Sequence, residues 1–275
     1  MMLPIVNTAQ WRKTVFYRIV ICVSITFISV VSFASIFVTP GYAEIAPDTI
    51  VGLWLLDEDK GREAKDSSGN ELHGTFTGSP KWREGKFGRA LELPGGGDTV
   101  KIEGLAQDFP AEEVTITSWV KAEGLKNQDL FSLEPLDPSR VTVHFPWDNQ
   151  LHWQFSTIWM HPPLALGEEV VGKWQHWAFI HSIADNVMLA YQDGEVVGES
   201  LNSKAYAPRA GDFHIGGRLG SSFKGFVDEV GIFEAVLSQD DIQSIMDNGL
   251  ETQVFAVAPT GKLAVSWGKM KVRRE

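Results

Sequence analysis

The sequence predicts an all-β protein: an antiparallel two-sheet sandwich with one short helix near its C-terminal end and a hydrophobic leader at its N-terminus. Short runs of alternating apolar and polar residues recur between turn residues, as in half-buried strands. The 275 residues include 26 Gly and 13 Pro, which favour turns over long helices. Outside the leader, one segment (residues 238–249) has the cap residues and apolar spacing of a helix. One domain of roughly 200 residues with appendages accounts for this chain.

The leader contains an uncharged run at residues 19–38, preceded by the basic residues Arg12, Lys13 and Arg18. At 1.5 Å per residue, a helix of this length spans roughly 30 Å and can cross a bilayer. Residues 1–43 are therefore either a signal peptide cut after Ala43, which ends a small-x-small site, or an uncleaved membrane anchor. We expect cleavage. Both alternatives export the body of the chain, because the positive charges stay inside.

The body begins with a strand at residues 49–56, followed by two turns. In the second turn, the Asp66 carboxylate can accept hydrogen bonds from the following backbone amides. Further strands are expected at residues 114–120, 130–133, 140–145, 150–156, 174–179, and in a hairpin at 187–192 and 195–197. Residues 157–172, with several prolines around Trp159, are expected to be a long loop.

The closing segment pairs a strand with the helix. Residues 225–233 alternate, so the strand places these residues on one side: Phe226, Asp228, Val230 and Ile232. The helix is expected at residues 238–248. Ser238 is a favourable N-cap, Asp241 stands at the spacing of a capping box, and Gly249 is a natural end. We expect the apolar stripe of the helix to pack down onto the domain.

Several motifs along the body occur in a recurrent order. They are Trp54, Asp57-Glu58, residues 66–70, His73-Gly74, Gly85-Lys-Phe-Gly88, Ala90-Leu91, Trp174-x-His176-x-Ala178 and Asp228-Glu229-Val230 with Leu237-Ser238. In this order they resemble laminin G-like domains, the jelly rolls of the concanavalin A-like lectin/glucanase superfamily. Pro94 and Thr99 depart from the family pattern. The resemblance implies a jelly roll over residues 44–250 and leaves the activity open, because this fold hosts many functions.

The tail, residues 251–275, follows the domain. Short strands are expected at residues 254–258 and 262–267, and the end is basic. It either packs along the domain as an extended segment or contacts an acidic surface partner.

Charge and cysteine content exclude some functions. The net charge is −11, and beyond residue 43 the chain carries 21 Lys and Arg against 35 Asp and Glu, a net charge of −14. A nucleic-acid-binding protein needs a basic surface, so nucleic acid is excluded as a partner. The one cysteine, Cys22, lies in the leader, so the body has no disulfide.

Aromatic and histidine residues are concentrated between residues 144 and 181. Trp153 and Trp177 share strand faces with apolar residues and are expected in the core. Trp147 and Trp159 lie in proline-rich, loop-like sequence and are the candidates for stacking against a sugar ring. Two histidines complete the candidate ligand site: His152, opposite Trp153 in its strand, and His144, its neighbour if the two strands pair. No spacing typical of a zinc site occurs.

Calcium is the candidate metal. Asp228 is expected on a packed side, where a charge is costly unless it is paired or coordinated. The first and last strands of a jelly roll usually neighbour each other, which brings Asp57 close, and many relatives of this fold bind calcium through such acids. The alternative is that Asp228 accepts hydrogen bonds from backbone amides or pairs with a basic residue.

Enzymatic motifs are absent from the sequence. Laminarinase-like glucanases of this superfold carry Glu-x-Asp-x-x-Glu on one strand, whereas Asp228 and Glu229 are adjacent and face opposite ways. Three hypotheses stay open. The first is an exported, non-catalytic binding or adhesion module that recognises carbohydrate or a cell-surface or matrix component. The others are a divergent glycan-active enzyme and a structural envelope scaffold.

Overall fold

The computed structural model describes residues 45–134, 140–145, 150–218 and 220–255. The predictions for the leader and for residues 256–275 lie outside the described residues. Within these ranges, no helix has the length and hydropathy needed to cross a membrane.

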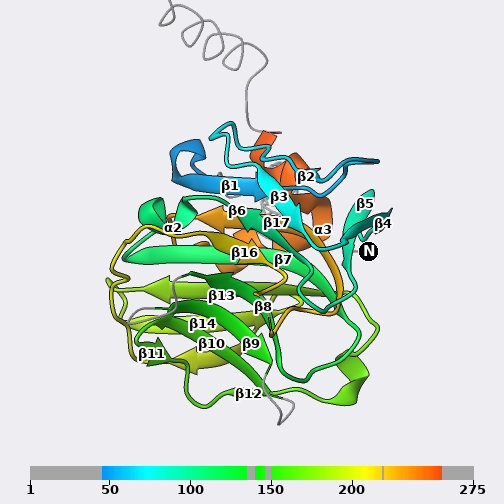
Figure 1. Cartoon of the computed structure of the whole chain (residues 1–275). Coiled ribbons are helices and arrows are strands. Elements are labelled where there is room, and N and C mark those ends of the chain that lie inside the picture. The colour runs from blue at the N-terminus through cyan, green and yellow to red at the C-terminus, as the bar shows by residue number, and fades with distance from the viewer. Residues whose placement is uncertain (1–44, 135–139, 146–149, 219, 256–275) are drawn as a thin grey trace, which may run out of the picture. The chain divides into compact units, whose positions relative to one another are not determined.

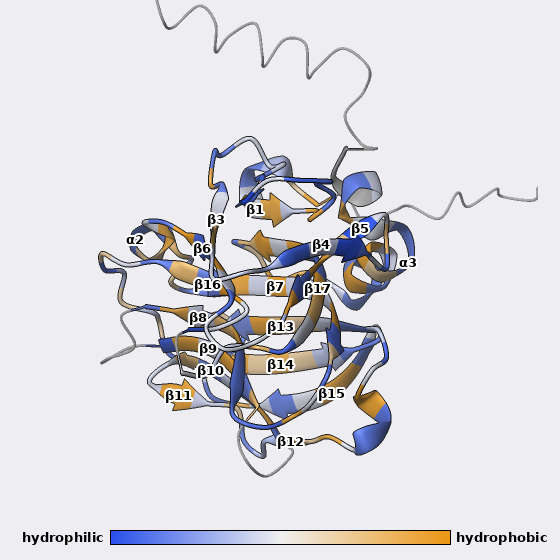
Figure 2. Cartoon of the chain, turned by 45° about the vertical axis from the view of Figure 1, so that its right-hand side comes forward, coloured by the Kyte–Doolittle hydropathy of each residue, from blue (hydrophilic) through white to orange (hydrophobic). Residues whose placement is uncertain are grey.

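The first sheet is antiparallel and has the strand order β15-β14-β13-β7-β17-β5-β4, with β1 paired to β17 (Figure 1). Its strands are β1 (Ile50–Trp54), β4 (Lys81–Glu84), β5 (Arg89–Leu93), β7 (Glu113–Ala122), β13 (Gln175–Ser182), β14 (Val187–Gln192), β15 (Glu195–Ser200) and β17 (Gly225–Phe233). Strand β14 carries mostly hydrophobic residues, whereas the edge strand β4 is mostly hydrophilic (Figure 2). As predicted, the first and last long strands of the domain, β1 and β17, are neighbours.

The second sheet has the order β11-β10-β9-β8-β16-β6-β3-β2, with β12 paired to β10. Its strands are β2 (Glu63–Ala64), β3 (Gly74–Thr77), β6 (Thr99–Ile102), β8 (Gln128–Leu133), β9 (Arg140–Phe145), β10 (Gln150–Ser156), β11 (Ile158–Trp159), β12 (Leu164–Ala165) and β16 (Phe213–Ile215). The remaining elements are η1 (Pro47–Thr49), α2 (Leu105–Asp108), η2 (Glu168–Val170) and α3 (Gln239–Phe255). The predicted two-sheet β-sandwich is therefore confirmed.

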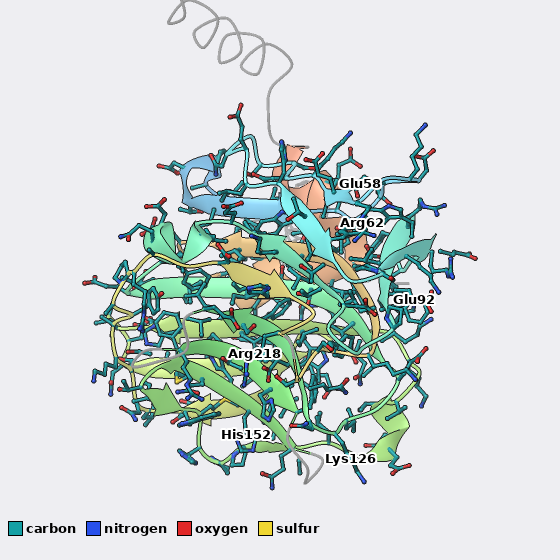
Figure 3. All side chains as sticks on the ribbon, viewed as in Figure 1. Glu58, Arg62, Glu92, Lys126, His152 and Arg218 are labelled. Atoms are coloured by element: carbon teal, nitrogen blue, oxygen red, sulfur yellow. The ribbon has the colours of Figure 1, made fainter. Side chains whose placement is uncertain are left out.

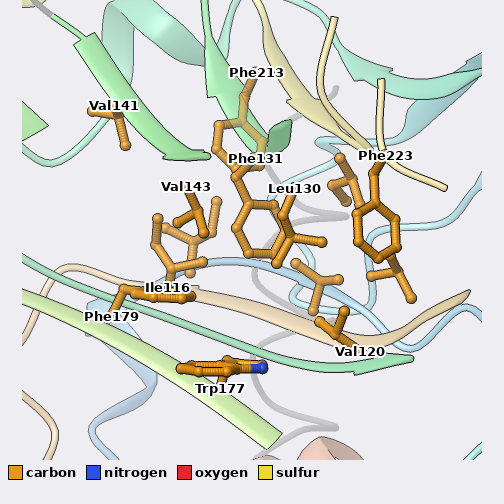
Figure 4. Packing of buried hydrophobic residues seen from close by; sticks show 14 of the residues in the cluster. Ile116, Val120, Leu130, Phe131, Val141, Val143, Trp177, Phe179, Phe213 and Phe223 are labelled. Carbon is orange, nitrogen blue, oxygen red and sulfur yellow. The ribbon is translucent and has the colours of Figure 1, made fainter. Parts of the chain in front are cut away.

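The main core fills the space between the two sheets. Figure 4 shows Phe131, Val143 and Phe213 of the second sheet facing Ile116 and Phe179 of the first. The core placement of two tryptophans is confirmed, because Trp153 is 0% exposed and Trp177 is 2% exposed. The Trp177 and Phe179 rings stack with their centroids 5.9 Å apart.

A second core lies between α3 and the outer face of the first sheet. Apolar residues of β1, β13, β14 and β17 pack there against the stripe of the helix: Ile50, Leu53, Ala178, Ile180, Tyr191, Phe233, Leu237, Ile242, Ile245 and Leu250. The helix begins as predicted. The Asp241 backbone N–H donates to Ser238 Oγ and the Ser238 N–H donates to the Asp241 carboxylate, a reciprocal capping box. Gly249, with φ +78°, interrupts the helical conformation where an end was expected.

Three local predictions are wrong. Residues 157–172 are not one loop, because β11, β12 and η2 lie within them and Trp159 belongs to β11. Residues 254–255 continue α3 and do not begin a strand. The third concerns the alternation in β17. A β-bulge interrupts its pairing with β7 after Asp228, and Glu229 has φ +52°.

The bulge changes which side chains of β17 face the main core. Val227 before the bulge, and Val230 and Ile232 after it, belong to the main core. Phe226 instead contacts Trp174, with ring centroids 6.2 Å apart, so Asp228 lies on the outer face with Phe226 and not with Val230. The predicted single face for these residues is corrected accordingly, because the extra residue inverts the alternation.

Replacing Trp177 with Ala should destabilise the domain by about 3–5 kcal/mol, because it leaves a large cavity beside Phe179 in the main core. Denaturant unfolding monitored by circular dichroism measures this change. Trp174→Ala, at a partly buried position on the outer face, is the control and should cost clearly less. Equal losses for the two variants would contradict the assignment of Trp177 to the core.

Candidate binding face

The outer face of the second sheet carries a continuous row of polar residues. Strand pairing places one residue from each of eight neighbouring strands directly opposite the next. We call this set the polar row, and from β2 to β11 it consists of Glu63, Thr75, Lys101, His214, Ser132, Thr142, Gln154 and Trp159. The next residues along these strands, such as Phe131, Val143 and Ile215, point into the main core. Because side chains alternate along a strand, the row faces outward.

The middle of the polar row is buried and lacks hydrogen-bond partners. Among the described residues, no hydrogen-bond partner is present for the Ser132 and Thr142 hydroxyls, for Gln154 Oε1 or for either ring nitrogen of His214. Their residues are between 0% and 9% exposed. His214 Nε2 lies 3.7 Å from Glu134 Oε2, beyond hydrogen-bonding distance. Buried polar atoms in native proteins are almost always hydrogen-bonded, to protein, ordered water or ligand. These atoms on four adjacent strands therefore mark the face as a place where partners from outside the chain are needed.

A network centred on Asp129 lies beside the polar row. The Asp129 side chain is 2% exposed. Its Oδ2 accepts a hydrogen bond of 2.6 Å from Ser221 Oγ and lies 3.2 Å from Arg218 Nε, and its Oδ1 contacts His144 Nδ1. Figure 3 shows Arg218 and His152 over strands β8 to β10. Arg218 compensates the buried charge of Asp129, as a buried carboxylate requires.

This network selects one tautomer of the neutral His144 ring. An ionised carboxylate only accepts hydrogen bonds, so His144 Nδ1 carries the hydrogen and donates it to Asp129. In the neutral ring, Nε2 is then an acceptor. His144 can thus accept a hydrogen bond from a ligand hydroxyl group.

The structure brings three of the four predicted ligand residues together. His144 of β9 is directly opposite His152 of β10, as expected if these strands pair. The His152 ring meets the Trp159 ring edge to face, with centroids 5.6 Å apart. Trp159 is only partly exposed. Trp147, the fourth candidate, lies outside the described residues.

Asp129, Arg218 and Ser221 were not predicted from the sequence. Arg218 and Ser221 lie in the connection between β16 and β17 and reach Asp129 only through tertiary structure. Asp129 offered one signal, a carboxylate directly before the predicted apolar strand at residues 130–133. An acid in such a position needs a partner.

Asp57 and Asp228, the predicted metal ligands, both bind the turn between β4 and β5. Asp228 Oδ2 accepts hydrogen bonds from the Lys86 and Phe87 backbone N–H groups, at 2.8 and 3.0 Å. Asp57 Oδ1 accepts one from the Arg89 N–H, at 2.6 Å.

Two glycines make room for these carboxylates. A Cβ at Gly85 would lie 2.6 Å from Asp228 Oδ2, and one at Gly88 would meet Asp57 Oδ1. The three motifs around residues 57, 85–88 and 228 therefore form one hydrogen-bonded structure. In it, Asp228 accepts hydrogen bonds from backbone amides, which is the alternative to calcium binding given in the sequence analysis.

The calcium hypothesis stays a prediction. Calcium takes six to eight oxygen ligands. Amide N–H groups already point at one oxygen each of Asp57 and Asp228. The described part of the chain contains no group of three or more His, Cys, Asp and Glu side chains that could hold a metal ion. Asp228 Oδ1 is buried without a partner, but these two carboxylates do not by themselves fit a calcium ion.

Burial raises the pKa values of two adjacent carboxyl groups in β17. The pKa of Asp228 rises from 3.8 to about 8, chiefly through loss of hydration, which outweighs the stabilising Phe87 and Lys86 amides. The pKa of Glu229 rises from 4.5 to about 7, again chiefly through burial. The Glu229 carboxylate accepts a hydrogen bond from the Leu250 N–H. The two carboxyl groups bind the β4–β5 turn and the Leu250 amide, and they lie on the first sheet, away from the polar row.

Together, the fold and this face define a two-sheet β-sandwich module whose second sheet has a polar, incompletely hydrogen-bonded outer face. The chain belongs to the concanavalin A-like lectin/glucanases superfamily, whose family model matches residues 94–243. A comparison with curated proteins found no match.

Solved structures share the fold at low sequence identity. Domain 4 of AbnA, an extracellular GH43 arabinanase from Geobacillus stearothermophilus solved with arabinotriose, is 21% identical with a TM-score of 0.60, covering 72% of this chain and 98% of that domain. The binding domain of botulinum neurotoxin DC, solved with rat synaptotagmin II, is 12% identical with a TM-score of 0.59, covering 75% and 53%. A Trypanosoma rangeli sialidase is 15% identical with a TM-score of 0.56, covering 74% and 33%. The chain thus spans about half of the toxin domain and a third of the sialidase, and the likeness shows the fold alone.

Stability should fall as the pH rises from about 4 to about 8, because Asp228 holds its proton more tightly in the folded protein than in the unfolded chain. Its contribution is complete below its ordinary pKa and is lost as the pH passes its folded pKa. Asp228→Asn should reduce this pH dependence by at least about 1 kcal/mol. Denaturant unfolding at a series of pH values measures it, and an unchanged slope in the variant would refute the assignment.

Thr142→Val should stabilise the free domain by about 1 kcal/mol, because it removes a buried hydroxyl without a partner and preserves the side-chain shape. Thr115→Val is the matched control. The Thr115 hydroxyl donates to the Ala235 carbonyl and accepts from the Leu237 N–H, so its loss should destabilise by about 1–3 kcal/mol. Thermal unfolding compares the two variants. Destabilisation by Thr142→Val would show that its hydroxyl is satisfied in the free protein.

Proposed function

We propose that residues 44–250 form a non-catalytic carbohydrate-binding module whose binding surface is the outer face of the second sheet. The observation that carries this proposal is the set of buried, unpartnered polar atoms on four adjacent strands of the polar row. Hydroxyl, amide and imidazole groups both donate and accept hydrogen bonds, as sugar hydroxyl groups require. Trp159 at the end of the row adds an aromatic surface beside His152.

Two further observations support binding without catalysis. Glycoside hydrolysis needs a pair of carboxyl groups flanking the scissile bond. Asp228 and Glu229, the acids with the raised pKa values, hold the β4–β5 turn and the Leu250 amide. Asp129, the buried acid beside the polar row, is occupied by Arg218, Ser221 and His144.

The relatives fit this proposal. The arabinanase domain was solved with arabinotriose and the toxin binding domain with rat synaptotagmin II, which supports a binding role for the shared fold. The arabinanase is extracellular, in agreement with export of this chain through residues 1–43. We include in the proposal export of the body, cleavage after Ala43, and a carbohydrate or a cell-surface or matrix component as the partner.

Trp159→Ala should reduce binding to polysaccharides by more than about tenfold, because loss of an aromatic anchor from a small binding surface typically costs about 2 kcal/mol or more. Affinity electrophoresis against arabinan, xylan, galactan, mannan and β-1,3-glucan measures binding. Trp174→Ala, on the outer face of the first sheet, should bind like the wild type.

The thermal transition of both variants controls for folding. Failure of the folded wild-type protein to bind any of these polysaccharides, with or without calcium, would reject the carbohydrate-binding proposal and favour the structural scaffold. Release of reducing sugar from a polysaccharide would instead favour the glycan-active enzyme.

A further inference from the structure

The polar row has a direction, which limits the shape of a ligand that can fill it. Each member lies directly opposite its neighbour on the next strand, from β2 through β11. Neighbouring strands lie about 4.8 Å apart, so the row runs across the sheet in steps of about that length. This step is comparable to the length of one sugar residue in a linear chain. A ligand that satisfies the whole row is therefore elongated and crosses the strands.

The middle of the row also selects the charge of the ligand. Its groups are two hydroxyls, an amide and an imidazole, at Ser132, Thr142, Gln154 and His214. Burial lowers the pKa of His214, which favours its neutral form, although Glu134 and Asp212 oppose this effect. These positions thus offer hydrogen bonds without a net charge.

Two cations in or beside the row, Lys101 and Arg218, already have acidic partners within the protein. Asp129 Oδ2 lies 3.2 Å from Arg218 Nε. Lys101 Nζ lies 3.7 Å from Asp212 Oδ2 and 3.9 Å from Glu103 Oε2. A ligand carboxylate would have to compete with these acids for the same cations, whereas uncharged hydroxyl groups would not.

We infer that the ligand is an extended chain of uncharged sugar residues, which lies along the polar row across the strands. This inference rests on the proposed function. A single terminal sugar would reach only part of the row. A charged terminal sugar would also lack an uncompensated cation at the middle of the row. Affinity then accumulates from hydrogen bonds spread over several strands.

Oligosaccharides of increasing length test this inference. The probes are linear series from the disaccharide to the hexasaccharide, prepared from each polysaccharide of the panel, with sialyllactose as a short charged probe. Isothermal titration calorimetry should give at least about tenfold tighter binding of the hexasaccharide than of the disaccharide, because each added hydrogen bond contributes modestly. Sialyllactose should bind more weakly than the neutral hexasaccharide.

Two exposed threonines of β3 provide a matched pair of variants. Thr75 belongs to the polar row, opposite Lys101, whereas Thr77 is opposite Thr99 on the same sheet. Thr75→Ala should weaken binding of the longest oligosaccharides only, and Thr77→Ala should change nothing. Gln154→Ala, in the middle of the row, should weaken binding at every length, with its thermal transition checked for folding.

The outcomes separate this inference from the proposed function. Polysaccharide binding with equal affinity for the disaccharide and the hexasaccharide would overturn the extended ligand and leave the binding function standing. Tighter binding of sialyllactose than of every neutral oligosaccharide would overturn the uncharged ligand in the same way. If neither the polysaccharides nor any oligosaccharide binds, both the inference and the proposed function fail.

Discussion

The hydrogen bonds of two adjacent carboxylates in β17 hold the β4–β5 turn and the α3 segment to the first sheet. Asp228 accepts the amides of the β4–β5 turn, and Glu229 accepts the Leu250 amide beyond the interruption of α3. Neighbouring residues in a regular strand point to opposite faces, and the β-bulge with its positive φ at Glu229 relaxes this constraint. One irregular position therefore fastens both the edge hairpin and the C-terminal helix to the central strand. Both carboxyl groups lose hydration in this arrangement, which explains their raised pKa values.

The outer faces of the two sheets differ in composition. The first sheet presents Ala178, Ile180 and Phe233 outward, and α3 covers them to form a second core. The second sheet presents hydroxyls, amides and histidines outward, opposite the aromatic residues of the main core (Figure 4). An apolar face buried by a helix contributes to stability through the hydrophobic effect. A polar face with unpartnered groups costs stability instead. Such atoms also occur on the outer face of the first sheet, at Thr117, Trp119, His176 and Asp228. We place function on the second sheet because its unpartnered atoms extend over four adjacent strands.

Sequence patterns predicted those features that depend on neighbouring residues. Alternation located β9, β10 and β17, and the spacing of Ser238 and Asp241 located the start of α3. The bulge was missed because Phe226, Asp228, Val230 and Ile232 read as an unbroken alternation, and the contact that accompanies the bulge comes from Leu250. The pairing of His144 with His152 was predictable because the two strands are consecutive. The polar row was not, because it depends on a strand order that places β16 between β8 and β6.

The unpartnered groups of the polar row also bear on how this module evolves. In a descendant released from ligand binding, selection for stability alone would favour apolar side chains at Ser132, Thr142 and Gln154, since each polar group there lacks an internal partner. Retained hydroxyl and amide groups at these positions would then distinguish relatives that still bind a ligand from those that only preserve the sandwich. The motifs at residues 57, 85–88 and 228 carry no such information, because they hold the fold in both kinds of relative.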